Sequence, residues 1–358
     1  MPGRRHSVRP VFVPPTLRPP TGSTPVPRVR RTDLREIAPP FNVVRAVNHI
    51  LTAKHGKRIA IIENEFGEVG VDDGLVVETK EEIFEMNNGC ICCTVRQDLI
   101  RILNKLMRRK DAFDHIIIET TGLADPAPVA QTFFVDEDLK EKLYLDAILT
   151  VVDVAHLSAH LDEVKPDGVE NESVEQIAFA DKILLNKTDL LKSDDDKASL
   201  VKKIRSINAR AAIIESQNSA VDVNSILGIN AFSLDATLEQ DAEFLDTDAE
   251  HQHDESVTSV GIEVVDAAMD IEKLEAWLRK LLSTRGEDIF RSKGILNVSG
   301  TDERYVFQGV HMMMEMSSSA EGEFEGWGKD AKRVSRVIFI GRNLDRDDLE
   351  SGFKACIA

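Results

Sequence analysis

The stretch DKILLNKTDL, residues 181–190, decides how this sequence folds. Its first half is a short, continuous run of apolar residues, and its second half changes at once to Asn186, Lys187, Thr188 and Asp189. A strand that is apolar on both faces is typical of a parallel sheet covered by helices on both sides. The four polar residues would then lie at the carboxyl end of a buried parallel strand.

Similar apolar runs alternate with amphipathic stretches over the first two thirds of the chain. The stretch at 98–110, for example, places Leu99, Leu103 and Leu106 on one face of a helix. This alternation predicts an α/β fold, a parallel sheet with helices on both faces. We expect strands at 57–63, 114–119, 145–153 and 181–186, and helices at 98–110, 125–134, 174–180 and 196–208.

The chain changes character after residue 233. Residues 234–255 are acidic and poor in β-branched residues, which indicates a linker between domains of 41–233 and 256–358. His251 and His253 in the linker are either a weak metal site or solvated loop residues. Grouped strands then predict a small α+β domain. Its strands are expected near 256–265, 293–298, 304–314 and 334–340, and its helices near 270–282 and 346–355.

Residues 1–40 differ sharply from the rest of the chain. They hold ten of the thirteen prolines, and nine arginines precede Ala46 against two acidic residues, Asp33 and Glu36. Such a segment cannot bury enough apolar surface to fold, so we predict a disordered tail. An organellar transit peptide has a similar composition, but a flexible tail or a wrongly assigned gene start is the interpretation we favour.

Charge and cysteine usage restrict the partners and the compartment. The net charge of −18 argues against nucleic acid or an anionic membrane as a partner. No run of about 18 apolar residues occurs, so we expect no membrane-spanning helix. Four cysteines, three of them crowded together, do not form a disulfide framework and indicate a reducing compartment, for which we expect the cytoplasm.

The pattern Asn-Lys-Thr-Asp at 186–189 predicts recognition of guanine. The carboxylate of Asp189 can accept two hydrogen bonds from guanine, a pattern that adenine cannot supply, while Asn186 braces the loop and the stem of Lys187 stacks on the base. Such a site rejects the wrong base because a buried unpaired polar group costs about 1–3 kcal/mol. A plain helix-entry turn is the alternative.

A second polar site follows the predicted strand at 114–119. Glu119 ends this strand and is followed by Thr120, Thr121 and Gly122. An acidic residue here corresponds to the Walker-B position of a phosphate-transfer site, where it acts on Mg²⁺ or its waters, and Gly122 would let the backbone approach the γ-phosphate. A strand end with a glycine turn is the alternative.

Two further clusters suit a metal ion. The loop at 62–73 gathers Glu63, Glu65, Glu68, Asp72 and Asp73, of which we expect one or two to be functional.

The segment NNGCICCTVR, residues 87–96, brings Cys90, Cys92 and Cys93 together. Thiolates suit zinc or copper(I), although a redox pair of Cys90 and Cys93 or an inert turn has the same spacing. No Cys or His pair is spaced to complete the site. It would therefore be open, with Glu63 or Glu68 as a further ligand, and an open site suits transfer better than permanent structure.

The segments GCICC, ENEFGE, ETTGLADP and NKTD together resemble the CobW-type GTPases, relatives of the UreG and HypB metallochaperones. The resemblance covers about residues 43–358 and includes KGILNVSG, YVFQGVH and RVIFIGRNLD in the C-terminal part. It implies a P-loop-NTPase-like sheet, binding and hydrolysis of GTP with Mg²⁺, and transfer of zinc to a client metalloenzyme. Eukaryotic members are thought to serve methionine aminopeptidase, and other members handle cobalt or iron.

The resemblance also implies the residues of the two sites. Zinc would be held by Cys90, Cys92 and Cys93. The nucleotide would lie near Gly122 and the guanine motif, and near the backbone of Cys93, Thr94, Val95, Arg96 and Gln97.

One departure from the family pattern concerns the phosphate-binding loop. Where the family has G-x-x-x-x-G-K-[ST], this chain reads REIAPPFNVVRAVNHIL, residues 35–51, without glycine or lysine. The strand that should precede the loop is also missing, since Pro39, Pro40 and the tail occupy its place. Without those amides and that lysine, the β- and γ-phosphates lose their cradle. We expect either a wrongly assigned first exon or a nucleotide-independent metal-binding or adaptor protein.

Overall fold

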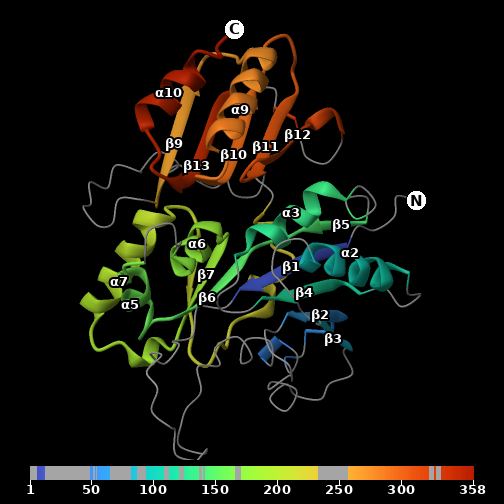
Figure 1. Ribbon diagram of the computed structural model, residues 1–358, viewed down its shortest axis with the longest axis vertical. Helices are drawn as coiled ribbons and strands as arrows, with labels where there is room; N and C mark the ends of the chain where they lie inside the picture. Colours follow the sequence, from blue (N-terminus) through green and yellow to red (C-terminus); the bar gives the residue numbers. More distant parts are fainter. Residues whose placement is uncertain are drawn as a thin grey trace, which may run out of the picture.

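The structure is a computed structural model, and it forms two domains, each built on one sheet (Figure 1). It describes residues 6–12, 49–50, 53, 55–64, 82–86, 94–108, 113–120, 125–136, 139, 142–165, 171–232, 257–321, 326–327 and 332–358. Within these ranges, no helix is both long and apolar enough to cross a bilayer.

The N-terminal domain contains an eight-stranded sheet whose described strand pairs are all parallel. The strand order is β3-β2-β4-β1-β6-β7-β8, and β5 also pairs with β1. The strands are β1 His6–Phe12, β2 Ile59–Asn64, β3 Glu82–Met86, β4 His115–Glu119, β5 Leu143–Leu145, β6 Leu149–Asp153, β7 Lys182–Asn186 and β8 Ala212–Glu215.

Both faces of this sheet are buried, as the continuous apolar runs predict. In β2, Ala60 and Ile62 belong to one core cluster, while Ile59 and Ile61 belong to another on the opposite face. The first cluster includes Leu99, Leu103 and Leu106, which confirms the predicted face of that helix. The helices of this domain are α2 Thr94–Met107, α3 Ala127–Val135, α5 Leu157–Leu161, α6 Glu172–Phe179 and α7 Asp194–Ile207.

The central strand of the sheet corrects one prediction. β1 lies between β4 and β6, in the place where the sequence indicates a missing strand, so the expectation of a tail disordered throughout 1–40 is wrong for His6–Phe12. Its sequence, HSVRPVF, hides it because Arg9 interrupts the apolar run and Pro10 has no N–H to donate to a ladder. Residues 13–48 lie outside the described residues, so the rest of the predicted tail stays a prediction.

Two other predicted strands are each divided in two. The stretch at 145–153 contains the end of β5 and all of β6. Between them, the backbone carbonyl of Asp146 accepts from the N–H of Phe232 at 2.8 Å, and its side chain accepts from the N–H of Asn230 at 2.7 Å. The stretch at 304–314 is a hairpin that turns at His311, which has a φ of 52°. The short strand β3 has no counterpart among the sequence predictions.

The C-terminal domain is a five-stranded antiparallel sheet with two helices on one face (Figure 1). Helix α9 buries Leu274, Leu278 and Leu281, and Trp277 packs between Phe339 and Phe353. The predicted linker at 234–255 lies outside the described residues, and so do His251 and His253. The elements are β9 Val257–Val265, α9 Ile271–Arg285, β10 Ile289–Asn297, β11 Arg304–Val310, β12 Met313–Ser318, β13 Val334–Arg342 and α10 Arg346–Lys354.

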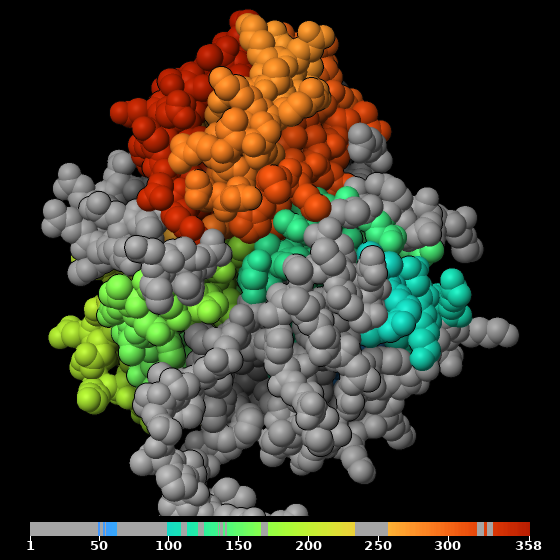
Figure 2. Space-filling model, in the orientation of Figure 1, coloured from blue at the N-terminus to red at the C-terminus, as the bar shows by residue number. Residues whose placement is uncertain are grey.

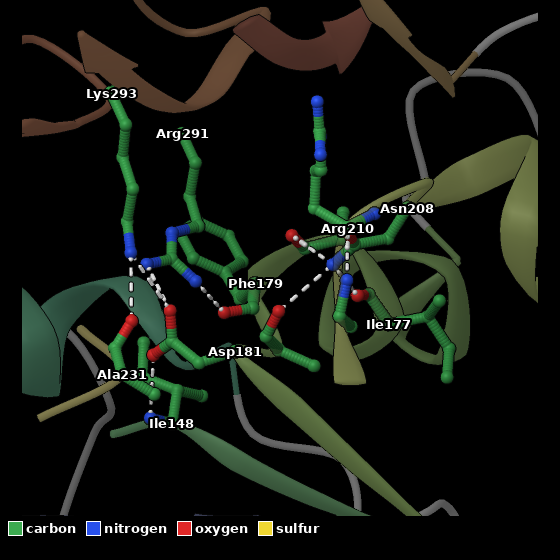
Figure 3. A network of polar contacts seen from close by, with 12 residues as sticks. Ile148, Ile177, Phe179, Asp181, Asn208, Arg210, Ala231, Arg291 and Lys293 are labelled. Atoms are coloured by element: carbon green, nitrogen blue, oxygen red, sulfur yellow. Dashed lines mark hydrogen bonds and ion pairs between the residues drawn. The ribbon is translucent and has the colours of Figure 1, made fainter. Parts of the chain in front are cut away.

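The two domains meet through an apolar contact and a buried polar network. Figure 2 shows the orange and red surface of the C-terminal domain lying directly on the green surface of the N-terminal domain. Phe179 at the end of α6 stacks on Phe290 of β10, with ring centroids 5.9 Å apart. Beside them, Asp181 binds Arg291 at 2.7 Å and Lys293 at 3.0 Å (Figure 3). The segment that leads into β7 is therefore anchored to the second domain.

Candidate nucleotide site

The polar residues singled out in the sequence lie along one edge of the parallel sheet. β4 ends at Glu119, which is the register partner of Glu63 in β2. β7 ends at Asn186, which is the register partner of Asp153 at the end of β6. Because all these strands run in parallel, their carboxyl ends form the edge at which open α/β sheets bind ligands.

Asn186 holds the loop that follows β8. Its side chain is buried, its Nδ2 donates to Ser219 Oγ at 2.9 Å, and its Oδ1 accepts from the Ser219 N–H at 2.8 Å and the Ser216 Oγ at 3.1 Å. Asn218 and Ser219 have φ values of 53° and 58°, so the loop turns sharply beneath this amide. The bracing contact expected of Asn186 is present.

Lys187 is fixed at both its backbone and its side chain. The backbone adopts the left-handed conformation, with φ 63° and ψ 37°. Its ammonium nitrogen lies 2.7 Å from Asp153 Oδ2, an oxygen that also lies 3.1 Å from His156 Nδ1. Burial by itself would raise the pKa of Asp153, but hydrogen bonds from Lys187, Ala155 and His156 outweigh it and leave the pKa below its usual value. Asp153 is therefore ionised near neutral pH and holds the lysine.

The last two residues of the motif differ in exposure. Thr188 donates from its N–H and its Oγ1 to the carbonyl of Ser216, at 3.3 and 3.2 Å. Asp189 lies in the short 3-10 helix η2 Thr188–Leu190 and is exposed. No hydrogen bond to its carboxylate comes from the described part of the chain. The contacts of Lys187 and Thr188 hold the backbone that leads to Asp189, and its carboxylate is left exposed.

The end of β4 has an unused polar atom. Glu119 is half-buried, and Thr120 next to it is buried with an Oγ1 that has no hydrogen-bond partner among the described residues. Buried hydroxyls in native proteins are normally satisfied, so such an atom fits a bound ion or phosphate oxygen. Thr121 and Gly122 lie outside the described residues, and Asp125 caps α3 through the N–H of Ala127 at 2.8 Å.

The elements on either side of the cysteine segment are β3, which ends at this edge, and α2. Cys90, Cys92, Cys93 and Glu68 lie outside the described residues, and of Glu63 only the place in β2 is described. Met86, the last residue of β3, is the register partner of Asn64 at the carboxyl end of β2. Thr94, Val95, Arg96 and Gln97 form the first turn of α2, which must return from this edge to reach the start of β4. The first turn of a helix offers free N–H groups to an anion.

The described ranges contain no group of three or more side chains that could hold a metal ion. Cys356, the cysteine that falls within them, is buried in the C-terminal domain, where its thiol donates to the Gly352 carbonyl at 3.3 Å. The metal prediction therefore depends entirely on the segment at 87–93 and the carboxylates near it.

Sequence reasoning missed three residues of this site: Asp153, Ser216 and Ser219. Each of them follows or ends an apolar strand. Asp153 is the last residue of β6, LTVVD, and the two serines come directly after β8. Polar residues directly after apolar strands are the pattern that led to Asn186 and Glu119.

Comparisons with known proteins agree with this arrangement. The model of the CobW/HypB/UreG nucleotide-binding domain matches residues 45–215, and that of the cobalamin synthesis protein cobW C-terminal domain matches residues 259–357. The first match begins after β1. The zinc chaperone YjiA of Escherichia coli is 32% identical over 311 residues, covering 86% of this chain and 92% of YjiA.

Two further comparisons extend this result. The zinc-regulated GTPase metalloprotein activator 1 of Schizosaccharomyces pombe is 35% identical over 332 residues, covering 83% of this chain and 78% of that protein. The crystal structure of Zn(II)-bound YjiA GTPase superposes with a TM-score of 0.70, at 25% identity and with 99% of each chain covered. The likeness therefore extends over both domains.

Proposed function

Since this chain belongs to the CobW family, with the nucleotide-binding and C-terminal domains in the family's order, we propose that it is a GTP-dependent zinc chaperone. Zinc is the cargo in this proposal. The thiolates of Cys90, Cys92 and Cys93 bind it, with Glu63 or Glu68 as a further ligand, and it passes to a client metalloenzyme as GTP is hydrolysed. The names of the relatives, zinc chaperone and metalloprotein activator, support this cargo.

The observation that carries the proposal is the geometry of residues 186–189. Asn186 braces the neighbouring loop, Lys187 is held by Asp153, and Asp189 is left exposed next to them. A carboxylate that accepts from two adjacent donors matches the N1–H and amino group of guanine. The same carboxylate would face an acceptor on adenine, which favours GTP over ATP.

The phosphate end of the nucleotide is proposed to involve Glu119 and Thr120. Mg²⁺, when bound, would neutralise charge that develops on the phosphates. The Oγ1 of Thr120, which has no partner among the described residues, and the carboxylate of Glu119 fit that environment. Residues 13–48, which follow β1, contain no G-x-x-x-x-G-K-[ST] sequence. This absence favours a second candidate, a metal-binding or adaptor protein that works without nucleotide.

Titration of fluorescent GTP into the full chain separates these two candidates. We expect a dissociation constant well below the millimolar range, weakened about tenfold or more by Asp189→Ala, because each lost hydrogen bond to a charged group is worth about 1.5–3 kcal/mol. Asp195→Ala, an exposed carboxylate in the first turn of α7, is the matched control. Millimolar or weaker binding by the unchanged chain would rule out the GTP-dependent function.

A zinc measurement tests the cargo. Cys92→Ser should lower the zinc bound per chain and weaken zinc in competition with a chelator, while circular dichroism stays unchanged. Cys356→Ala is the control, since this cysteine lies in the other domain. Unchanged zinc content in Cys92→Ser would exclude the proposed site, and tighter binding of cobalt or iron would reassign the cargo. Methionine aminopeptidase is the first client to test for activation.

A further inference from the structure

We infer that Asp153 is a positioning residue of the guanine site, and that it acts by holding the ammonium of Lys187. The inference rests on the proposed function, because it assigns a role in binding the guanine base. It concerns a residue outside the Asn-Lys-Thr-Asp motif, 34 positions earlier in the chain than Lys187.

The ion pair of Asp153 and Lys187 is largely shielded from water, so it can hold the lysine side chain in place. The side chain of Asp153 is 11% exposed and that of Lys187 is 23% exposed, with the two charged atoms 2.7 Å apart. Exposed pairs contribute little because water screens them and the long side chain loses entropy, whereas a largely buried pair is screened much less. Of the two partners, Asp153 is the more rigid, because its Oδ1 also accepts from the N–H of Ala155 at 3.0 Å.

The backbone on both sides of Lys187 is held, so its stem can point in few directions. Asn186 is bound to the 216–219 loop on one side, and Thr188 is bound to the Ser216 carbonyl on the other. Between them, Lys187 adopts a left-handed backbone conformation. For a residue other than glycine this conformation costs about 1–2 kcal/mol. A conformation of this cost persists only where its surroundings impose it.

Asp153 then fixes the far end of the stem. Because β6 and β7 are neighbours, the ammonium reaches from the end of β7 to the end of β6, and the Val154 N–H donates to the Asn186 carbonyl between them. A stem tied at both ends offers its methylene groups as a fixed apolar surface beside Asp189. A planar base can pack on that surface without first ordering the side chain, and this pre-organisation strengthens binding.

One substitution separates this role from the structural role of Asp153. The Oδ1 of Asp153 stabilises the turn after β6, and its Oδ2 holds Lys187. In Asp153→Asn the amide oxygen can still accept from Ala155, while the charge that holds the ammonium is lost. The variant should therefore fold normally and release the lysine, together with the exposed His156 ring that contacts the same oxygen.

The binding experiment is a double-mutant cycle with fluorescent GTP. Asp153→Asn should weaken binding about tenfold, the loss expected for one charge-assisted hydrogen bond. In Lys187→Met the same substitution at 153 should have little further effect, because Asp153 acts through the lysine. The matched control is Asp162→Asn, which also removes a lysine partner, Lys203, but lies on the surface. Equal losses in the presence and absence of Lys187 would overturn the positioning role.

A measurement without nucleotide distinguishes failure of this inference from failure of the proposed function. Acylation of the Lys187 amine, followed by mass spectrometry of its peptide, should be several-fold faster in Asp153→Asn than in the unchanged chain. An unchanged rate would overturn the inference whatever the chain binds. If the unchanged chain binds GTP but Asp153→Asn binds it equally well, the inference fails alone. If the unchanged chain binds no guanine nucleotide, the proposed function fails and the positioning role with it.

Discussion

The two ends of strand β7 are built in opposite ways. Just before its start, the side chain of Asp181 is 3% exposed and is surrounded by Arg291 and Lys293 of the other domain and by the N–H of Ile148 (Figure 3). At its end, Asn186 is buried and satisfied, but Asp189, three positions on, is exposed without a hydrogen bond from the described residues. A single five-residue strand thus joins two polar networks. We call the one around Asp181 the closed end, because its groups are buried, and the one around Asn186 the open end, because Asp189 is exposed.

The difference shows which carboxylate serves the fold and which is available to a ligand. Every group around Asp181 belongs to the protein, and Lys293 also donates to the carbonyl of Ala231 at 3.1 Å. At the other end, the protein satisfies the residues that precede Asp189 and leaves its carboxylate exposed. A binding site is expected to present a polar group that has hydrogen-bonding capacity left for a ligand, next to residues whose own hydrogen bonds are made within the protein.

The largest expected effect is at the closed end. Asp181→Asn keeps an acceptor for Ile148 but leaves the Arg291 and Lys293 cations buried without a counter-charge. Removing one partner of a buried ion pair costs about 3–5 kcal/mol, and we expect the free energy of unfolding in urea to fall by that amount. Asp162→Asn, on the surface, should cost less than about 1 kcal/mol. Similar losses of unfolding free energy in the two variants would show that the buried ion pairs of Asp181 stabilise the fold no more than a surface pair does.

The next effect is a pH dependence that arises at Lys293. Burial, helped by the charge of Arg291, lowers the pKa of Lys293 from 10.5 to about 8 despite the opposing effect of Asp181. Between about pH 8 and 10.5 the unfolded chain therefore binds more protons than the folded chain, so stability rises with pH in this window. This contribution is lost as the pH falls through about 8, and its full size is at most about 3 kcal/mol.

The comparison that isolates this effect uses Lys293→Met, which leaves the Asp181–Arg291 pair in place. Urea unfolding of both chains at several pH values should show the rise between about pH 8 and 10.5 only where Lys293 is present. Parallel curves for the two chains would assign the pH dependence to other groups.

The smallest effect on stability is at the open end. Asn186→Ala removes three hydrogen bonds and leaves Ser219 and its N–H buried, so the free energy of unfolding should fall by about 1–3 kcal/mol. Asp189→Ala should change it by less than about 0.5 kcal/mol, because the carboxylate is exposed. Thermal and urea unfolding measure both. A larger loss for Asp189→Ala would show that its carboxylate has a structural role.

Local patterns predicted the parts of the molecule that depend on near neighbours in sequence. Apolar runs predicted a sheet buried on both faces, and the three leucines of α2 predicted the side of that helix that packs. The strand at 181–186, followed by Asn186 and its neighbours, predicted both a strand and a polar loop at its carboxyl end. These features follow from the spacing of residue types, which the chain itself displays.

Other features were hidden because their signals lie far apart or are weak. β1 contains Arg9 and Pro10, so its sequence lacks the pattern of a buried parallel strand. Its pairing with β6 covers only two residues. The partner of Lys187 is 34 positions away, and the partners of Asp181 in the second domain are 110 and 112 positions away. No local pattern indicates such pairs.

The sequence by itself determined which residues could serve the site: a carboxylate, a lysine and an amide at the end of an apolar strand. Only the tertiary structure decided their roles, because burial and partners depend on how strands and domains pack. Packing β6 beside β7 gave Lys187 its partner, and docking the second domain closed the network around Asp181. Asp181 and Asp189 lie at the two ends of the same strand, and it is their surroundings that bury one in a polar network and leave the other exposed.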